Sequence, residues 1–124
     1  MSKDRYIVGV DLGGTSINVG VVPFEGGTVL GMRSLPTEAT RGAKSVVDRM
    51  IGMIREAMKD AAREAAVGED AYLGIGLGSP GPLDRASGTV IETPNLGWRN
   101  FPLRDLVANE IGRASCRDRV LTLV

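Results

Sequence analysis

Gly9-Val10-Asp11-Leu12-Gly13-Gly14-Thr15 contains the most informative turn in this sequence. It follows and overlaps a short run rich in β-branched residues, Tyr6 to Leu12, which is typical of a buried strand. Two consecutive glycines let the backbone pass close to a ligand, and the successive amide groups of such a turn can bind an anion. A carboxylate at the end of the strand, here Asp11, can hold a hydrated Mg²⁺ beside it.

The same spacing also fits a plain hairpin turn, in which the glycines supply positive φ angles and Asp11 caps the turn. The residues alone leave a phosphate-binding turn and a structural hairpin equally open. One nucleotide-binding motif is excluded, because no Gly-Lys-Ser/Thr sequence follows and the turn is therefore not a P-loop.

Outward from this turn, the spacing of apolar residues predicts an α/β unit. Alternating apolar and polar residues predict strands, whereas apolar residues three or four positions apart after Ala43 predict a long amphipathic helix. Gly68 is expected to end that helix in a left-handed conformation. The order is strand-strand-strand-helix-strand, with a weak extended segment and a short helix after it. The expected strands are 6–12, 17–22, 28–35 and 71–77, the helices 43–66 and 102–110, and the weak segment 88–92.

The composition fits one folded domain or a part of a larger protein. The chain has 124 residues, of which 43% are hydrophobic and 24% charged, and this balance argues against disorder. Its 15 basic and 15 acidic residues cancel, so no net charge attracts nucleic acid or anionic lipid. No segment is long and apolar enough for a signal peptide or a membrane span, so a cytoplasmic protein is expected.

The residue types present limit the chemistry. The sequence has no His, which removes the commonest general base and metal ligand. Its single cysteine, Cys116, excludes an internal disulfide, and no metal-ligand spacing surrounds it. Any catalysis must therefore use carboxylates, backbone amides or a cofactor metal, or else the catalytic part lies outside this chain.

A second glycine-rich motif extends from Gly74 to Pro82, at the end of the fourth expected strand. Its glycines at 76, 78 and 81 match the spacing of a dinucleotide-binding turn. That turn requires the third glycine to open a helix, whereas here Pro82-Leu83-Asp84 continues as turn and extended chain, so dinucleotide binding is excluded. The motif then indicates either tight strand packing or a strand end whose bare backbone approaches a ligand.

A third motif, Pro94-Asn95-Leu96-Gly97-Trp98, places an amide side chain between a proline and a glycine turn. The Asn95 amide can donate and accept hydrogen bonds, which suits a sugar hydroxyl. Trp98 could stack on a sugar ring, but a lone tryptophan is more often an anchor in a core or a lid. We therefore interpret Trp98 as an anchor.

Together the three motifs resemble the N-terminal lobe of the ROK family of sugar kinases, most closely its bacterial glucokinases. The similarity covers residues 6–109, in the family's order and spacing. It implies an actin/hexokinase-like (ribonuclease H-like) lobe and ATP-dependent phosphorylation of a hexose at its 6-hydroxyl, with Mg²⁺. Glucose is expected because the third motif resembles that of glucokinases; mannose, fructose, N-acetylated sugars and polyphosphate as donor stay open.

The resemblance also assigns roles to individual residues. Those expected to face the ATP phosphates are Asp11, Gly13, Gly14 and Thr15. Asp11 would hold Mg²⁺ through water, Gly81 and Pro82 would border the sugar, and Asn95 would bond to it. Ser16 departs from the pattern, since many members have Lys there, and this affects only a contact at the surface or near the phosphates.

Other parts of the family's machinery have no counterpart here. The family's catalytic base is an Asp in a Glu-Asn-Asp segment, expected shortly after Glu110, and the sequence has no such segment. The later sugar-binding Glu and His residues, the cysteine-rich zinc site and the lobe that holds adenosine are also missing. We therefore expect residues 1–110 to be a truncated, inactive lobe without a catalytic residue. Any structural Zn, and most of the homodimer contact that the family implies, would belong to the missing part.

Residues 111–124 fit no pattern of the family. The segment from Ile111 to Val120 resembles the translation of a widely used short-read sequencing adapter, except that Asp118 stands where that translation gives Glu. We therefore expect a non-native tail at 111–124, with no role for Cys116. The alternative is a native loop followed by a strand at 119–124.

Two other functions fit parts of the sequence. A sugar-responsive transcription regulator of the same family would place a winged helix-turn-helix before the lobe, and the sequence leaves no room for one before Asp11. Its neutral charge also disfavours DNA binding. A sugar-binding module without catalysis is what this chain would be if it were complete. The expected partners are therefore a hexose and ATP, with no nucleic acid and no membrane.

Overall fold

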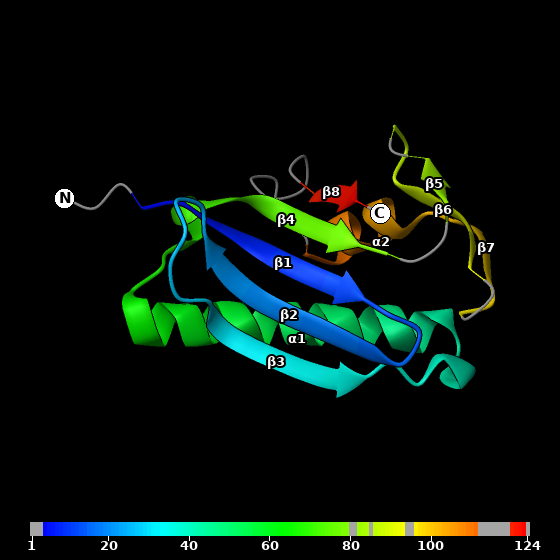
Figure 1. Cartoon of the computed structure of the whole chain (residues 1–124), viewed down its shortest axis with the longest axis horizontal. Coiled ribbons are helices and arrows are strands. Elements are labelled where there is room, and N and C mark those ends of the chain that lie inside the picture. Colours follow the sequence, from blue (N-terminus) through cyan, green and yellow to red (C-terminus); the bar gives the residue numbers. More distant parts are fainter. Residues whose placement is uncertain (1–3, 80–81, 85, 94–95, 112–119, 124) are drawn as a thin grey trace.

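The structure, a computed structural model, describes residues 4–79, 82–84, 86–93, 96–111 and 120–123. Its centre is a five-stranded sheet in the order β3-β2-β1-β4-β8 (Figure 1). Strands β1, β2 and β3 form an antiparallel meander, whereas β4 runs parallel to β1 and to β8. The bounds are β1 (Tyr6–Leu12), β2 (Ser16–Pro23), β3 (Leu30–Pro36), β4 (Tyr72–Gly78) and β8 (Val120–Leu123).

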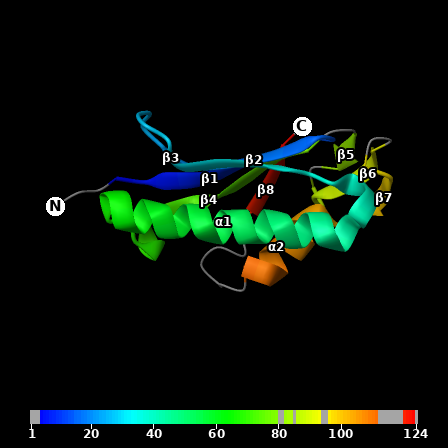
Figure 2. The ribbon, with the colours of Figure 1, turned by 90° about the horizontal axis from the view of Figure 1, so that it is seen from below.

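Two helices, α1 (Ala43–Ala65) and α2 (Leu103–Ile111), lie on the same face of this sheet (Figure 2). The apolar residues of α1 recur every three or four positions, so they form one stripe that packs against the strands. The buried residues of α1 are Val46, Val47, Met50, Ile51, Met53, Ile54, Ala57 and Ala61. Short 3-10 turns, η1 (Ala39–Arg41) and η2 (Glu69–Ala71), flank α1. No helix of the described part is long and apolar enough to cross a membrane.

The inner face of the sheet is built by alternating β-branched and leucine side chains. Val8 of β1 lies between Val21 of β2 and Ile75 of β4, and all three are at most 2% exposed. Because side chains alternate along a strand, the residues next to these three in their own strands point to the other face. The core therefore forms one layer between the sheet and α1, and the ends of β1 and β4 lie at its edge.

The C-terminus of α1 differs from the expectation. Ala66, not Gly68, adopts the left-handed conformation, with a φ of 55°, and its N–H donates to the Ala62 carbonyl at 3.0 Å. Gly68 is extended, with a φ of −87°. The prediction for Gly68 is wrong because the chain turns two residues earlier, which brings the buried Val67 onto the core.

A second, smaller sheet of β5 (Leu83–Asp84), β6 (Thr89–Thr93) and β7 (Trp98–Phe101) follows β4, and all its pairings are antiparallel. The expected segment at 88–92 corresponds to β6. Strand β7 was not expected, because its sequence Trp-Arg-Asn-Phe does not alternate between apolar and polar residues. The α/β class and the strand-strand-strand-helix-strand order are confirmed.

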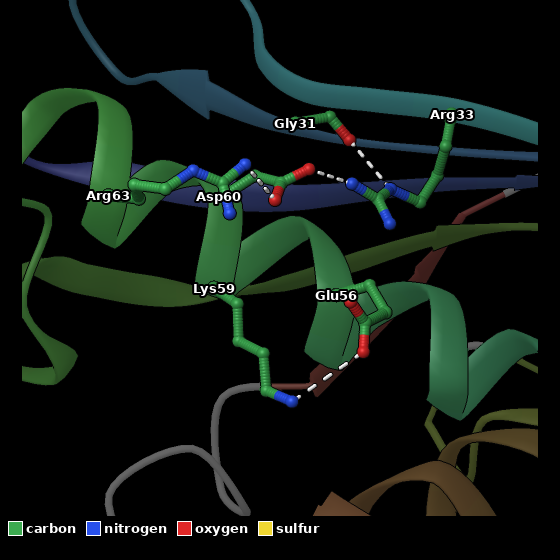
Figure 3. A network of polar contacts seen from close by, with 6 residues as sticks. All are labelled: Gly31, Arg33, Glu56, Lys59, Asp60 and Arg63. Carbon is green, nitrogen blue, oxygen red and sulfur yellow. Dashed lines mark hydrogen bonds and ion pairs between the residues drawn. The ribbon is translucent and has the colours of Figure 1, made fainter.

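Strand β3 approaches α1 closely at Gly31. Gly31 has a φ of +61°, and a Cβ atom there would lie 2.7 Å from the Ala57 carbonyl oxygen. Beside it, Arg33 donates to the Asp60 carboxylate on α1 and, through Nε at 3.0 Å, to the Gly31 carbonyl (Figure 3). Asp60 also accepts from Arg63 at 2.7 Å. This network ties β3 to α1 at the outer edge of the sheet.

We expect Asp60→Asn to lower the free energy of unfolding by about 1–2 kcal/mol, because it removes a charged acceptor shared by two arginines. The Asp60 side chain is only 20% exposed. Glu56→Gln is the matched control one turn away on α1. Glu56 is 55% exposed and pairs with Lys59 at 3.6 Å, so removing its charge should change the free energy of unfolding by less than about 0.5 kcal/mol. Urea denaturation of the two variants measures both, and equal effects would show that the Arg33–Asp60 contact adds nothing to stability.

Candidate functional site

The Asp11 carboxylate lies at the edge of the sheet where β1 and β4 end. Asp11 is paired with Gly78 of β4 on one side and with Asn18 of β2 on the other. A Cβ atom at Gly78 would lie 3.9 Å from Asp11 Oδ1, so the carboxylate lies over bare backbone. Asp11 is exposed, and among the residues that the structure describes its carboxylate has no hydrogen-bond or ion-pair partner. It is therefore free to bind a ligand from outside.

The turn that follows β1 connects it to β2. The Gly13 N–H donates to the Ser16 carbonyl at 2.9 Å, which closes the hairpin. Neither Gly13 nor Gly14 has a positive φ, so left-handed backbone does not explain the two glycines. A Cβ atom at Gly13 would lie 3.1 Å from the Ser16 carbonyl oxygen, which leaves little room for a side chain there. Thr15 is exposed at the tip of the turn.

Thr37, just beyond β3, holds this turn and was not singled out from the sequence. It is fully buried, at 0% exposed. Its hydroxyl donates to the Gly13 carbonyl at 2.8 Å, and its backbone N–H donates to the Thr15 carbonyl at 2.9 Å. A threonine after a proline gives no local sign of such a role, because both bonds join residues more than twenty positions apart in the chain.

On the expected sugar side, two of the three predicted residues, Gly81 and Asn95, lie outside the described residues. The third, Pro82, is exposed, and its carbonyl accepts from the Ile91 N–H at 2.9 Å, which places it beside β6. Asp84, two residues beyond Pro82, accepts from the Ala86 N–H and the Ser87 hydroxyl and so closes the turn before β6. Within the described part, Asp84 therefore serves the turn.

The second sheet also anchors the segment that contains the third motif. The Thr93 carbonyl accepts from the Gly97 N–H at 2.7 Å, and its hydroxyl accepts from the Trp98 N–H at 3.3 Å. Trp98 is 4% exposed and stacks on Phe101, with ring centroids 4.1 Å apart. The interpretation of Trp98 as an anchor is confirmed, and Thr93 and Trp98 fix both ends of the turn between β6 and β7.

The residues present fit a magnesium ion held mainly by a nucleotide. No group of three or more His, Cys, Asp or Glu side chains that could hold a metal occurs in the described part of the chain. Mg²⁺ in phosphate sites usually keeps several waters and takes only one or two protein carboxylates, the rest of its shell coming from phosphate oxygens. A single exposed carboxylate beside a tight turn, as at Asp11, meets that requirement.

A separate hollow of about 750 Å³ lies between β3 and α1 and contains none of the predicted site residues. Its basic side chains are paired: Arg49 lies 2.9 Å from Glu38, and Lys44 donates to Asp48 at 2.7 Å. This hydrogen bond, together with the charge of Asp48, raises the pKa of Lys44. We assign no ligand to this hollow.

Known proteins match most of the chain. A family model described as the ROK family matches residues 7–117. The chain belongs to the ROK family. The glucokinase of Thermotoga maritima is 37% identical over 108 residues, which are 86% of this chain and 31% of that protein. The xylose repressor of Caldicellulosiruptor bescii is 30% identical over 101 residues, which are 82% of this chain and 24% of that protein. The chain spans less than a third of the length of the curated ROK relatives that it matches.

Solved structures of ROK proteins have the same fold. The ROK hexokinase of Thermus thermophilus superimposes with a TM-score of 0.73 at 34% identity, over 96% of this chain and 35% of that one. A ROK glucokinase of Streptomyces griseus, solved in complex with glucose and AMPPNP, gives a TM-score of 0.71 at 30% identity, over 94% of this chain and 32% of that one. The expected actin/hexokinase-like (ribonuclease H-like) lobe is therefore confirmed.

Proposed function

We propose that this chain is the N-terminal lobe of an ATP-dependent hexose kinase that phosphorylates the 6-hydroxyl of a hexose, with glucose as the preferred sugar. The observation that carries the proposal is the glycine turn at 13–15 beside the exposed, unpartnered Asp11, at the edge where β1 and β4 end. The relationship to a glucokinase, and the likeness to part of a ROK glucokinase that was solved in complex with glucose and AMPPNP, support this choice.

The residues divide between the two substrates. The amide groups of Gly14 and Thr15 would bind phosphate oxygens, and Asp11 would hold Mg²⁺ through water. Gly13, whose own N–H is bonded to the Ser16 carbonyl, would face the phosphates through its bare backbone. Mg²⁺, when bound, neutralises charge that develops on the transferred phosphoryl group. On the other substrate's side, the residues proposed to border or bond to the sugar are Gly81, Pro82 and Asn95.

Phosphoryl transfer also needs a group that accepts the proton of the attacking hydroxyl and a second surface that holds the nucleotide base. The family's Glu-Asn-Asp segment, which carries that Asp, has no counterpart in this sequence. We therefore propose that residues 1–110 bind parts of both substrates and are inactive alone. The intact protein would act in the cytoplasm as a homodimer, and a structural Zn, where present, would belong to its other part.

A coupled assay of ADP release by the intact protein tests this function. We expect turnover that requires both Mg²⁺ and a hexose, with glucose giving the highest kcat/KM in a panel that includes mannose, fructose and N-acetylglucosamine. Polyphosphate in place of ATP is the donor control. Absence of hexose-dependent ADP release from a folded protein that contains the complete gene product would contradict the proposal.

A regulator is the second candidate, because the chain is also related to a xylose repressor. A gel shift at low salt with fragments of the neighbouring promoter distinguishes it, and we expect no shift for a kinase.

For a sugar-binding module without catalysis, glucose alone would raise the melting temperature and ATP with Mg²⁺ would have no effect.

For the C-terminus, we propose a non-native tail at 111–124. The adapter-like sequence from Ile111 to Val120 supports this. Two features favour a native segment instead: β8 pairs with β4, and the family match extends to residue 117. A long read of the gene from the codon of Leu106 onward separates the two. A gene that continues into a Glu-Asn-Asp segment supports the tail, and one that encodes 111–124 before a stop codon contradicts it.

A further inference from the structure

The peptide groups of the turn at 13–15 are oriented by one buried residue, through its hydroxyl and its backbone N–H. The two bonds that Thr37 makes go to the carbonyls of Gly13 and Thr15, which lie on either side of Gly14. A trans peptide places its C=O and N–H on opposite sides of the bond. With the Gly13 carbonyl held toward Thr37, the N–H of Gly14 in the same peptide group points away from Thr37.

Thr37 is in turn held in place by hydrogen bonding from helix α1. Arg49 of α1 donates to the Thr37 carbonyl at 2.7 Å and, more weakly, to the Pro36 carbonyl at 3.3 Å. The same guanidinium lies 2.9 Å from the Glu38 carboxylate, and the Arg49 side chain is only 16% exposed. The segment from Pro36 to Glu38 is therefore fixed on one side by α1 and on the other by the turn.

We propose that Thr37 is a positioning residue for phosphate binding: its hydroxyl fixes the Gly13 carbonyl so that the Gly14 N–H is presented outward before the nucleotide arrives. This inference rests on the proposed kinase function for its ligand. Thr37 does not touch the substrate, since it is fully buried. Its contribution is preorganisation, because a turn that is already ordered loses less conformational entropy when it binds.

Three variants of the intact protein test the role of the hydroxyl. Thr37→Val keeps the shape and removes the donor, Thr37→Ser keeps the donor, and Thr40→Val removes an exposed hydroxyl three residues later as the matched control. We expect Thr37→Val to lower kcat/KM for MgATP by about tenfold while the KM for the hexose stays within about twofold. Thr37→Ser should recover most of the loss, and Thr40→Val should behave as the unmodified protein.

Amide hydrogen exchange separates this inference from the proposed function. In Thr37→Val the amide of Gly13, which donates to the Ser16 carbonyl, should exchange about tenfold faster, and in Thr37→Ser it should not. If the intact protein has no hexose-dependent turnover, the kinase proposal fails. Calorimetry then tests the inference separately, by measuring whether Thr37→Val lowers the affinity for inorganic phosphate or MgATP.

Unchanged exchange of the Gly13 amide in Thr37→Val would overturn the inference, because the hydroxyl would then not order the turn. An equal loss of kcat/KM for MgATP in Thr37→Val and Thr37→Ser would also overturn it, because packing and not the hydroxyl would then matter. Thr37→Ala, which also lacks the donor but adds no methyl group, takes the place of Thr37→Val should that variant fail to fold.

Discussion

Asp11→Asn in the intact protein should lower kcat for hexose phosphorylation by about a hundredfold or more, with the KM for the hexose within about twofold. The substitution keeps the size of the side chain and removes the charge that would hold Mg²⁺ through water. Asp11 belongs to the motif proposed to bind phosphate and is distant in the sequence from the motif proposed to bind the sugar, so sugar binding should be nearly unaffected. Steady-state kinetics with glucose and MgATP varied in turn measure both quantities.

Loss of folding does not explain such an effect. The Asp11 side chain is exposed and has no partner within the described part of the lobe, so its replacement should leave the melting temperature unchanged. Glu25→Gln, which removes an exposed carboxylate from the loop between β2 and β3, is the control and should keep full activity. Full activity in Asp11→Asn would remove Asp11 from the phosphate site.

Gly31→Ala should lower the free energy of unfolding by about 2–5 kcal/mol, the sum of backbone strain and steric overlap. At a φ of +61° an alanine is strained, and its Cβ would lie 2.7 Å from the Ala57 carbonyl oxygen and 3.0 Å from its Cα. These are backbone atoms of α1, so neither a rotamer change nor a small side-chain movement relieves the overlap. Urea denaturation followed by circular dichroism measures the loss.

Two other glycines separate strain from overlap. Gly26 has a φ of +90° and nothing within 4 Å of a Cβ position, so Gly26→Ala should show strain alone, about 1 kcal/mol. Gly52 lies exposed within α1 with open space around it, and Gly52→Ala should stabilise the protein by about 0.5–1 kcal/mol. If Gly31→Ala costs no more than Gly26→Ala, β3 does not lie against α1 as closely as the structure has it.

Local patterns explain why the main sheet and α1 could be predicted. The run from Tyr6 to Leu12 and the three-four spacing after Ala43 are properties of adjacent residues, and the structure has β1 and α1 there. Strand β7 depends on pairing with β6, and the turn at Ala66 depends on where Val67 is buried. Both are tertiary effects that a window of sequence does not contain.

The candidate site divides in the same way. The residues proposed to face a ligand, such as Asp11 and Gly13, belong to one short motif, and that motif can be found in the sequence. Thr37, just beyond β3, is bonded to that motif, and Arg49 of α1 is bonded to Thr37, so both hydrogen bonds join segments apart in the chain. Charge and spacing along the sequence carry no record of those contacts, so only the three-dimensional structure could show them.

The most direct test of the proposed function follows the phosphate itself. The intact protein is incubated with glucose, Mg²⁺ and ATP labelled at its γ-phosphate, and the sugar is recovered and the labelled position identified. We expect label on the 6-hydroxyl of glucose, and in Asp11→Asn we expect it to form about a hundredfold more slowly, or more slowly still. A folded protein that binds glucose but transfers no label, or that labels it equally fast without the Asp11 carboxylate, would contradict this account.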